Sequence, residues 1–331
     1  MPPDPILEVK GLRVELSTRS GTVPVLDDLS FSIDAGETLA FVGESGCGKS
    51  MTALAVMGLV PHPIGRIASG SIRLAGEDLT RVPEKRMRAV RGNDVSMIFQ
   101  EPMTALNPVY TAGEQIAESL RRHQDMGRRA AWEHAIEMLA AVGIPDPRGR
   151  ASAYPHQMSG GQRQRVMIAM ALACRPKVLI ADEPTTALDV TVQAQIFELL
   201  KDLRRETGTA LILITHDMGV VAEMAERMIV MYAGRKVEDG MVTDVIAEPK
   251  HPYTRGLISC VPHLAEVLTE ERPDLTEVPG VVPPLTQFGR DMCLFSSRCP
   301  LADDKCWEER PPERRFGAGH VAACWHAEEV S

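Results

Sequence analysis

The stretch GESGCGKS, residues 43–50, constrains the fold of this chain more than any other eight residues. It fits the pattern G-x-x-x-x-G-K-S/T at every fixed position, between the apolar runs TLAFV (38–42) and MTALAVMGL (51–59). In a strand–loop–helix of this kind, the glycines let backbone N–H groups surround phosphate oxygens at the positive end of the helix. The sequence therefore predicts a nucleotide-phosphate site on an α/β fold, rather than a chance glycine-rich turn.

The same chemistry assigns roles to single residues. Lys49 is expected to reach the β- and γ-phosphates, and the Ser50 hydroxyl is expected to ligate Mg²⁺. Such a loop needs an acidic partner on a neighbouring strand, and VLIADEP (178–184) supplies Asp182, acting on the metal through water. Glu183 is then placed to polarise an attacking water. An ordinary strand end is the alternative for this acidic pair, and it loses weight because the pair follows a phosphate loop.

Charge and composition restrict the partners and the compartment. The net charge is −9, and nucleic acid is not expected as a partner because that binding draws most of its affinity from neutralised phosphates. No apolar run approaches the ~18 to 20 residues that span a bilayer. The N-terminus MPPDPILEVKG has no basic region followed by an apolar stretch, so it does not resemble a secretion signal. The chain is expected in the cytosol, with docking on a membrane partner left open.

Hydrophobic periodicity predicts an order of elements typical of an α/β fold of about two domains. Strands are expected over residues 6–16, 26–33, 38–42, 177–182 and 210–215, helices over 51–59, 162–174, 190–206 and 218–225, and a hairpin over 227–240. Residues from about 102 to 160, rich in Ala, Arg, Glu and Met, predict a helical insertion. From residue 241 onward prolines are frequent and periodic stretches are few, so we expect an irregular appendage.

The stretch MSGGQRQRV (158–166) narrows the class of protein. Its serine and two glycines at a helix N-terminus make a second anion site, far in sequence from Lys49. The stretch matches the signature sequence of ATP-binding-cassette proteins, and the chain resembles that family from Leu7 to about residue 255. The resemblance implies a RecA-like parallel-sheet core, an antiparallel β subdomain and an α-helical insertion in a cassette domain (1–255). A Cys-containing appendage (256–331) follows.

The resemblance also implies further site residues. Gln100 in MIFQEP is similar to the Q-loop, which senses Mg²⁺ and touches the membrane partner, and Asp189 ends TTALD, which is similar to the D-loop. His216 in LITHD is similar to the switch histidine that contacts the γ-phosphate, although alone it would more often be a satisfied strand-end residue. The expected ATP-binding residues are Gly43, Ser45, Gly46, Cys47, Gly48, Lys49, Ser50, Met51 and Gln100. Catalysis is assigned to Glu183 and His216, and Mg²⁺ to Ser50, Gln100 and Asp182.

In this family, the signature of one subunit closes over the ATP held by the phosphate loop of its partner. The residues expected to act on the partner's ATP are Ser159, Gly160, Gly161 and Gln162. A chain with one cassette must therefore pair with another, and two ATP molecules hold the dimer closed until hydrolysis opens it. The family usually stacks adenine on an early aromatic residue, whereas the matching position in LRVEL holds Leu16. Adenine is expected to pack there on an aliphatic surface or on another residue.

Two longer stretches, residues 96–118 and KHPYTRGLISCVP (250–262), resemble the ATPase subunits of dipeptide and oligopeptide importers. On its own, HPYT is a turn-like tetrapeptide and indicates little. The resemblance implies a second homologous ATPase, two membrane-spanning permeases and an extracytoplasmic peptide-binding protein, with this chain at the cytoplasmic face of the membrane. It also implies a groove near Gln100 that receives a permease helix, although most apolar residues of the insertion must be plain bundle core.

Two other functions are alternatives to peptide import. Nickel or glutathione import is one, because those ATPases look much alike. A soluble cassette ATPase acting on DNA or ribosomes is the alternative from another class. Such proteins usually carry two cassettes or a long coiled coil in one chain, and this sequence shows neither.

Four of the seven cysteines, Cys293, Cys299, Cys306 and Cys324, crowd into the last 39 residues. The Pro-rich appendage has few apolar residues for a core, so a cross-link is what it lacks. Four thiolates suit tetrahedral zinc or an iron–sulfur cluster, although the spacing of 5, 6 and 17 intervening residues lacks the C-x₂-C of common zinc modules. Unpaired thiols and disulfides stay open on spacing alone. The importer resemblance and the proline after Cys299 favour a structural 4Fe–4S cluster, with His326 a less suitable ligand.

Overall fold

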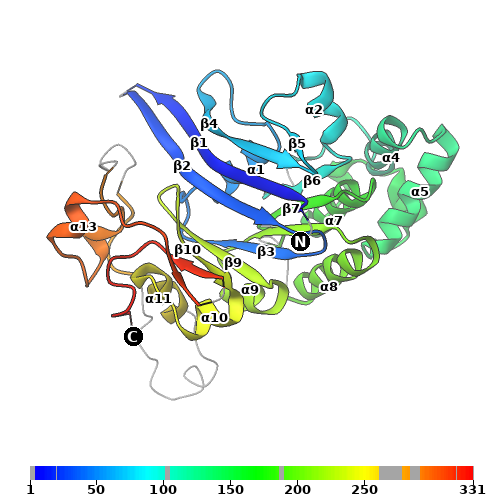
Figure 1. Ribbon diagram of the computed structural model, residues 1–331. Coiled ribbons are helices and arrows are strands. Elements are labelled where there is room, and N and C mark those ends of the chain that lie inside the picture. The colour runs from blue at the N-terminus through cyan, green and yellow to red at the C-terminus, as the bar shows by residue number, and fades with distance from the viewer. Residues whose placement is uncertain are drawn as a thin grey trace, which may run out of the picture.

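The computed structural model describes residues 4–19, 21–100, 105–185, 190–260, 278–283, 291–317 and 319–330. The described elements form two sheets, a helical arm and the appendage (Figure 1). The arm and the appendage lie at opposite ends of the molecule, at the right and the left of the view. The predicted fold class is confirmed, because a parallel core, an antiparallel sheet and a helical insertion are all present.

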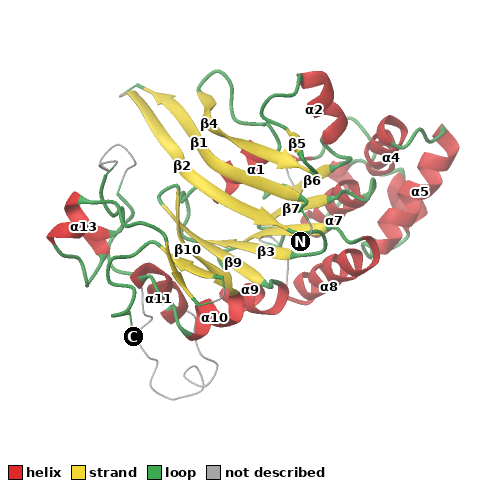
Figure 2. Cartoon of the chain, in the orientation of Figure 1, coloured by secondary structure: helices red, strands yellow, loops and turns green. Residues whose placement is uncertain are grey.

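An eight-stranded sheet forms the centre of the molecule, in the order β11-β12-β10-β9-β3-β8-β7-β6 (Figure 2). Its strands are β3 (Thr38–Val42), β6 (Val95–Ile98), β7 (Val178–Asp182), β8 (Ala210–Ile214), β9 (Arg227–Tyr232), β10 (Arg235–Met241), β11 (Arg314–Phe316) and β12 (His320–Ala322). Neighbours from β9 to β6 run parallel, and those from β9 to β11 run antiparallel. Every residue of β3, β7 and β8 is buried, as the continuous apolar runs of a covered parallel sheet require.

A four-stranded antiparallel sheet, in the order β2-β1-β4-β5, packs over the central one. Its strands are β1 (Leu7–Thr18), β2 (Gly21–Ile33), β4 (Gly65–Leu74) and β5 (Glu77–Asp78). One apolar cluster joins the two sheets, and in it the rings of Phe31 and Phe41 meet edge to face at 5.0 Å. This cluster also holds the buried face of the first helix, which fixes that helix against the central sheet.

The helices are α1 (Lys49–Val56), α2 (Glu84–Val90), α4 (Ala112–His123), α5 (Arg128–Ala141), α6 (Pro147–Ala151), α7 (Gly160–Leu172), α8 (Val190–Thr207), α9 (Met218–Met224), α10 (Val242–Ala247), α11 (Pro252–Ser259) and α13 (Asp304–Glu308). We call α4, α5 and α6 the helical arm. The arm begins where the Thr111 side chain caps α4 by accepting the Glu114 N–H. Ile116 and Leu120 then lie on the buried face of α4, against the cluster that includes α5 and α7.

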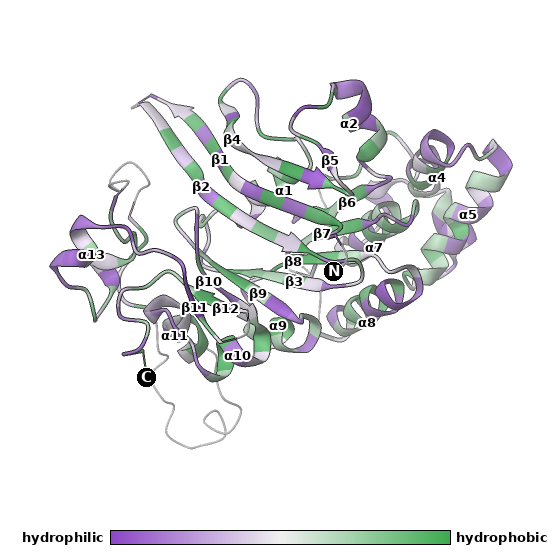
Figure 3. Ribbon diagram, viewed as in Figure 1, coloured by the Kyte–Doolittle hydropathy of each residue, from purple (hydrophilic) through white to green (hydrophobic). Residues whose placement is uncertain are grey.

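Figure 3 shows how hydrophobic and hydrophilic residues are distributed over these elements. Helix α8 alternates between green and purple residues along its length, as an amphipathic helix on a sheet does. The ribbon of helix α5 is purple, for hydrophilic residues, at the outer end of the arm. Among the described residues, none of the helices combines the length and the apolar character that crossing a bilayer would require.

The appendage is irregular over much of its described length, as predicted, but two of its strands join the central sheet. Strand β12 pairs with β10, and β11 pairs with β12. The fully buried carboxylate of Glu238 lies at this junction, 2.7 Å from His320 Nε2, and it accepts the backbone N–H groups of Lys250 and His251. The sequence did not predict these strands because runs of three residues are too short to show alternation. The division into domains at residue 255 stays a prediction.

Candidate functional site

The phosphate loop connects the buried strand β3 to α1, as the sequence predicts. Gly43 has φ 151°, and a Cβ there would lie 2.3 Å from the Met231 carbonyl oxygen, so only glycine fits. Gly48, at φ 108°, is the N-cap of α1, and no side chain of the described chain caps that helix. The first N–H groups of α1 are therefore left without a side-chain partner, which is the arrangement that binds phosphate.

Lys49 folds its ammonium group into the same loop. Its Nζ donates to the carbonyl oxygens of Gly43, at 2.6 Å, and Glu44, at 3.1 Å, and the side chain is almost completely buried. Carbonyl oxygens carry only partial charge, so a phosphate group is a stronger partner for this cation. The lysine is thus held beside the place where the loop would receive a phosphate.

The three residues predicted to hold Mg²⁺ line one cavity of about 380 Å³. Burial raises the pKa of Asp182, and a hydrogen bond from Ser50 opposes that rise. Asp182 Oδ1 is buried with no hydrogen-bond partner in the described part of the chain. A buried carboxylate oxygen without a donor suits a divalent cation or its bound water, so Ser50, Gln100 and Asp182 fit the predicted metal.

Glu183, predicted as the general base, contacts two other predicted residues. Its Oε2 accepts a hydrogen bond from Gln100 Nε2 at 2.9 Å, and its Oε1 lies 3.2 Å from His216 Nδ1. Its backbone has φ 46°, in the left-handed region that a non-glycine residue adopts at a cost of about 1–3 kcal/mol. The structure therefore brings together three residues that lie on separate stretches of the sequence. The backbone of one of them, Glu183, adopts a strained left-handed conformation.

The signature residues lie at the N-terminus of α7, on the surface of the described chain. Ser159 and Gln162 form a capping box, in which each side chain accepts the backbone N–H of the other. Gly160 is exposed, and Gly161 is partly exposed. Among described residues, no hydrogen bond or ion pair joins these four residues to the phosphate loop of the same chain. The N-terminus of α7 is therefore accessible from outside this chain.

Other predicted residues fall at the margins of the site. Ser45 and Gly46 are exposed at the tip of the phosphate loop, Cys47 is buried, and Met51 is partly buried. Leu16 is partly buried in β1, opposite Gly65 of β4. Asp189 lies outside the described residues.

Sequence reasoning missed two contacts around this site. Gln164 of α7 is buried and donates to the carbonyl of Pro184, which links the signature helix to the segment that follows Glu183. Glu44 of the phosphate loop pairs with Arg298 of the appendage. The first contact joins residues 20 positions apart and the second joins residues 254 positions apart, so no local pattern could have predicted either.

Cys293, Cys299, Cys306 and Cys324 are free thiols, two of them buried and two partly buried. Burial, with a smaller contribution from other thiols of the group, raises the pKa of Cys293 to about 11 and that of Cys324 to about 12. The four side chains therefore lie near enough to act on one another electrostatically. Without a metal to stabilise thiolates, they are protonated at neutral pH.

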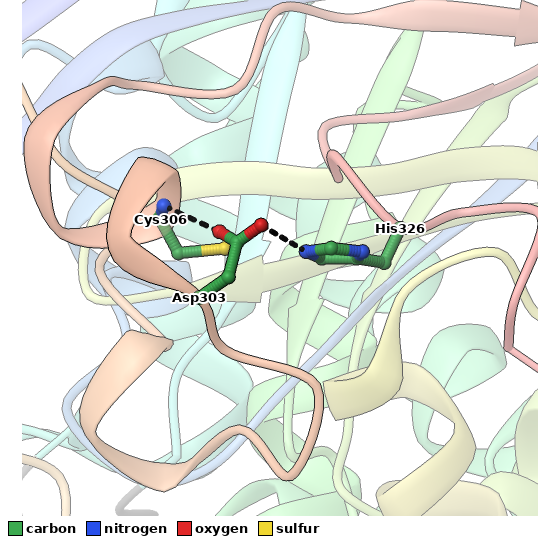
Figure 4. A group of neighbouring side chains, drawn as sticks. All are labelled: Asp303, Cys306 and His326. Carbon is green, nitrogen blue, oxygen red and sulfur yellow. Dashed lines mark hydrogen bonds and ion pairs between the residues drawn. The ribbon is translucent and has the colours of Figure 1, made fainter.

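Four thiolates at ~2.3 Å from one zinc ion would lie about 3.8 Å from each other. Among described residues, the one group of three or more possible ligand atoms within 4.8 Å of one another is Asp303, Cys306 and His326 (Figure 4). In it Asp303 caps α13 through the Cys306 N–H and lies 3.2 Å from His326 Nε2, so the group is satisfied internally. The four sulfur atoms are thus not arranged for a single zinc ion. Four thiols are also the donor set that iron–sulfur clusters use.

Comparisons with known proteins agree with the fold and the site. Residues 26–186 match the family described as ABC transporter, and residues 237–306 match the family described as Oligopeptide/dipeptide transporter, C-terminal region. Two dimeric structures of the ATP-binding cassette MJ0796, one of them bound to ADP and Pi, superpose with a TM-score of 0.65 at 27% identity. They cover 71% of this chain and 98% of theirs. The fold and the phosphate site thus define an ATP-binding cassette.

Curated relatives cover nearly the whole chain. A putative peptide import ATP-binding protein of Brucella melitensis is 48% identical over 99% of this chain and 98% of its own. The dipeptide transport ATP-binding protein DppD of Bacillus subtilis is 48% identical over 97% and 94%, and the oligopeptide transport ATP-binding protein OppD of Salmonella typhimurium is 49% identical over 98% and 94%. The chain therefore belongs to the ABC transporter family, among its oligopeptide/dipeptide transport ATP-binding proteins.

Proposed function

We propose that this chain is the ATP-hydrolysing subunit that energises import of dipeptides or oligopeptides across the cytoplasmic membrane. The observation that carries the proposal is the end-to-end similarity to peptide transport ATP-binding proteins, which includes the C-terminal region as well as the cassette. The relatives described above are named for peptides, which favours peptides over nickel or glutathione. None of these relatives is named for DNA or ribosomes, which disfavours a soluble cassette of that kind.

In the proposed reaction, water attacks the γ-phosphorus of ATP, its proton goes to Glu183, and the bond to the ADP oxygen breaks. The contacts of Glu183 with Gln100 and His216 support this assignment, because they aim its carboxylate at one place. Lys49 neutralises charge on the β- and γ-phosphates. Ser50, Gln100 and Asp182 would hold Mg²⁺, which would supply positive charge to offset the charge of the phosphates.

The active assembly contains two cassettes. Ser159, Gly160, Gly161 and Gln162 act on the ATP of the partner, and Asp189 belongs to the D-loop on the evidence of the sequence. The dimeric cassette MJ0796 supports this arrangement, because its structure is related to this chain over most of the cassette. The partner is a second, homologous ATPase. Two permeases and an extracytoplasmic peptide-binding protein complete the importer, and this chain lies peripherally at the cytoplasmic face of the membrane.

The assembly is tested by purifying the tagged chain from detergent-solubilised membranes of its own cells. Two membrane-spanning permeases and a second cassette ATPase are expected to co-purify. The same tag on an unrelated cytosolic protein is the control. Recovery of the chain in a membrane-free ribosome complex would contradict the proposal.

For the appendage, we propose a structural 4Fe–4S cluster on Cys293, Cys299, Cys306 and Cys324. Four free thiols, three of which have a pKa raised by other members of the group, support it, as does their lack of the close packing that a single zinc ion requires. The cluster would supply the cross-link that a segment with little apolar core lacks. Zinc is the alternative occupant.

Anaerobic purification should therefore yield a chain with broad visible absorption and about four iron and four sulfide per molecule. Cys299→Ser is expected to lose the absorption and to lower the melting temperature. Cys260→Ser, at a thiol outside the group, is the matched control and should keep both. Stoichiometric zinc without iron, or no metal at all, would contradict the cluster.

A further inference from the structure

Arg298 of the appendage lies against the phosphate loop. It ends the 3₁₀ turn η3 (Ser296–Arg298), and its side chain is only 3% exposed. Its two terminal nitrogens each donate to one oxygen of the Glu44 carboxylate, with Nη1 2.6 Å from Oε2 and Nη2 3.0 Å from Oε1. Glu44 is the second residue of the phosphate loop, so a bidentate ion pair joins the appendage directly to the candidate nucleotide site.

The surroundings of Arg298 use all five of its N–H donors. Besides the two that bind Glu44, Nε donates to the Pro279 carbonyl at 2.7 Å, Nη2 to the Val278 carbonyl at 3.2 Å, and Nη1 to the Tyr232 hydroxyl at 3.5 Å. The guanidinium also lies 5.8 Å from the ring centroids of Tyr232 and Phe295. A cation held this completely has one orientation, and that orientation fixes the carboxylate it binds.

A second contact holds the backbone of Glu44. Its N–H donates to the Tyr253 hydroxyl at 2.8 Å, and Tyr253 is fully buried in α11. The Tyr253 ring packs against Tyr232 at 4.8 Å and against Phe295 at 5.3 Å, so the same aromatic group supports both contacts. Glu44 is thus fixed through its side chain by Arg298 of the appendage and through its backbone by Tyr253 of α11.

The carboxylate of Glu44 has a consequence for phosphate binding. The carbonyl of the same residue accepts a hydrogen bond from Lys49, so this negative group belongs to the loop that would receive the phosphates. An unpaired carboxylate there would repel the anion and compete for the Lys49 ammonium. The ion pair with Arg298 removes both effects.

We propose that Arg298 is a positioning residue for ATP. By pairing with Glu44 it cancels a negative charge in the phosphate loop and keeps that carboxylate turned toward the appendage. The appendage then contributes a side chain that supports ATP binding. This inference rests on the proposed ATP site and adds a residue that lies outside every cassette motif.

Arg298→Ala in the full chain is expected to raise the Kd for MgATP, measured by equilibrium dialysis with labelled ATP, about tenfold. The kcat at saturating ATP should stay near that of the parent, because Arg298 touches no reacting group. The deciding variant is the double mutant Arg298→Ala/Glu44→Ala. Removing the carboxylate removes the repulsion, so the double mutant should bind ATP within about threefold of the parent, and Glu44→Ala alone should do the same.

Three controls keep the experiment decisive. Arg310→Ala, a partly exposed arginine of the appendage that pairs with Asp28, should bind ATP like the parent. Metal content and melting temperature of each preparation show whether the appendage is intact. If Arg298→Ala fails to fold, Arg298→Lys is the substitute, because it keeps the positive charge but cannot make the bidentate ion pair. It should lose less affinity for ATP than Arg298→Ala would, and adding Glu44→Ala should again restore the affinity.

Two results would overturn the inference. Parent-like ATP affinity in both Arg298 variants is the first. The second is a double mutant that binds ATP as weakly as Arg298→Ala, because the arginine would then act only by supporting the fold. The Lys49→Ala variant distinguishes these two results from a failure of the proposed ATP site. If the parent binds no ATP, or if Lys49→Ala binds ATP as well as the parent does, the proposed function is overturned together with the inference.

Discussion

Glu183→Gln is expected to lower ATP turnover by a factor of about 10²–10⁴, the usual contribution of a general base. Glutamine has nearly the same shape as glutamate, so it can still meet Gln100 and His216, but it cannot take a proton from water. The variant should bind MgATP as the parent does. ATP that is bound but not hydrolysed should hold the cassettes together, so a closed dimer should accumulate.

Phosphate release and size-exclusion chromatography with MgATP measure the two effects, in the presence of the partner cassette where one is required. The matched control is Glu84→Gln, the same change at an exposed carboxylate of α2 that pairs with Arg91. That variant should hydrolyse ATP at the parental rate. Parental turnover in Glu183→Gln would show that another group is the base.

Lys49→Ala is expected to weaken MgATP binding about a hundredfold, because it removes a charge-assisted contact to the phosphates from a buried position. The fold should survive, since among the described residues this ammonium donates to loop carbonyls and to the neighbouring Cys47 sulfur. Equilibrium dialysis with labelled ATP measures the affinity. Lys10→Ala, at an exposed lysine of β1, is the control. Unchanged affinity in Lys49→Ala would place the phosphates elsewhere.

Local patterns were sufficient to predict the central part of this fold. The runs that became β3, β7 and β8 are short, continuous and apolar, and such runs are typical of strands in a covered parallel sheet. The phosphate loop was predictable for a related reason. Its glycines are required by backbone geometry, as the close approach of Gly43 to Met231 shows. Because this requirement concerns the backbone of a short loop, it can be recognised from the residues of the loop itself.

The contacts that complete the site could not be predicted in this way. Gln100 meets Glu183 across 83 positions, and its role was suggested by family resemblance rather than by its own surroundings in the sequence. Arg298 reaches Glu44 across 254 positions, from a segment without periodicity. Contacts of this kind depend on how the chain folds back on itself, and neither propensity nor spacing carries that information.

The appendage shows the same limit. Four cysteines in a segment with few apolar residues predicted a bound metal or cluster there, and that stays a prediction. The sequence did not indicate that β12 would extend the central sheet, or that α11 and η3 would bring Tyr253 and Arg298 to the phosphate loop. The appendage is therefore attached to the cassette through a strand, an aromatic cluster and an ion pair.

Uptake of a labelled peptide by cells in which Glu183→Gln is the only copy of this chain tests the central claim most directly. Cells with the parent chain should accumulate dipeptide or oligopeptide, and the substituted cells should accumulate almost none although the protein is present at the membrane in equal amount. Uptake of a labelled amino acid by another system should be equal in both. Parental peptide uptake in the Glu183→Gln cells would contradict the claim that ATP hydrolysis at this site drives peptide import.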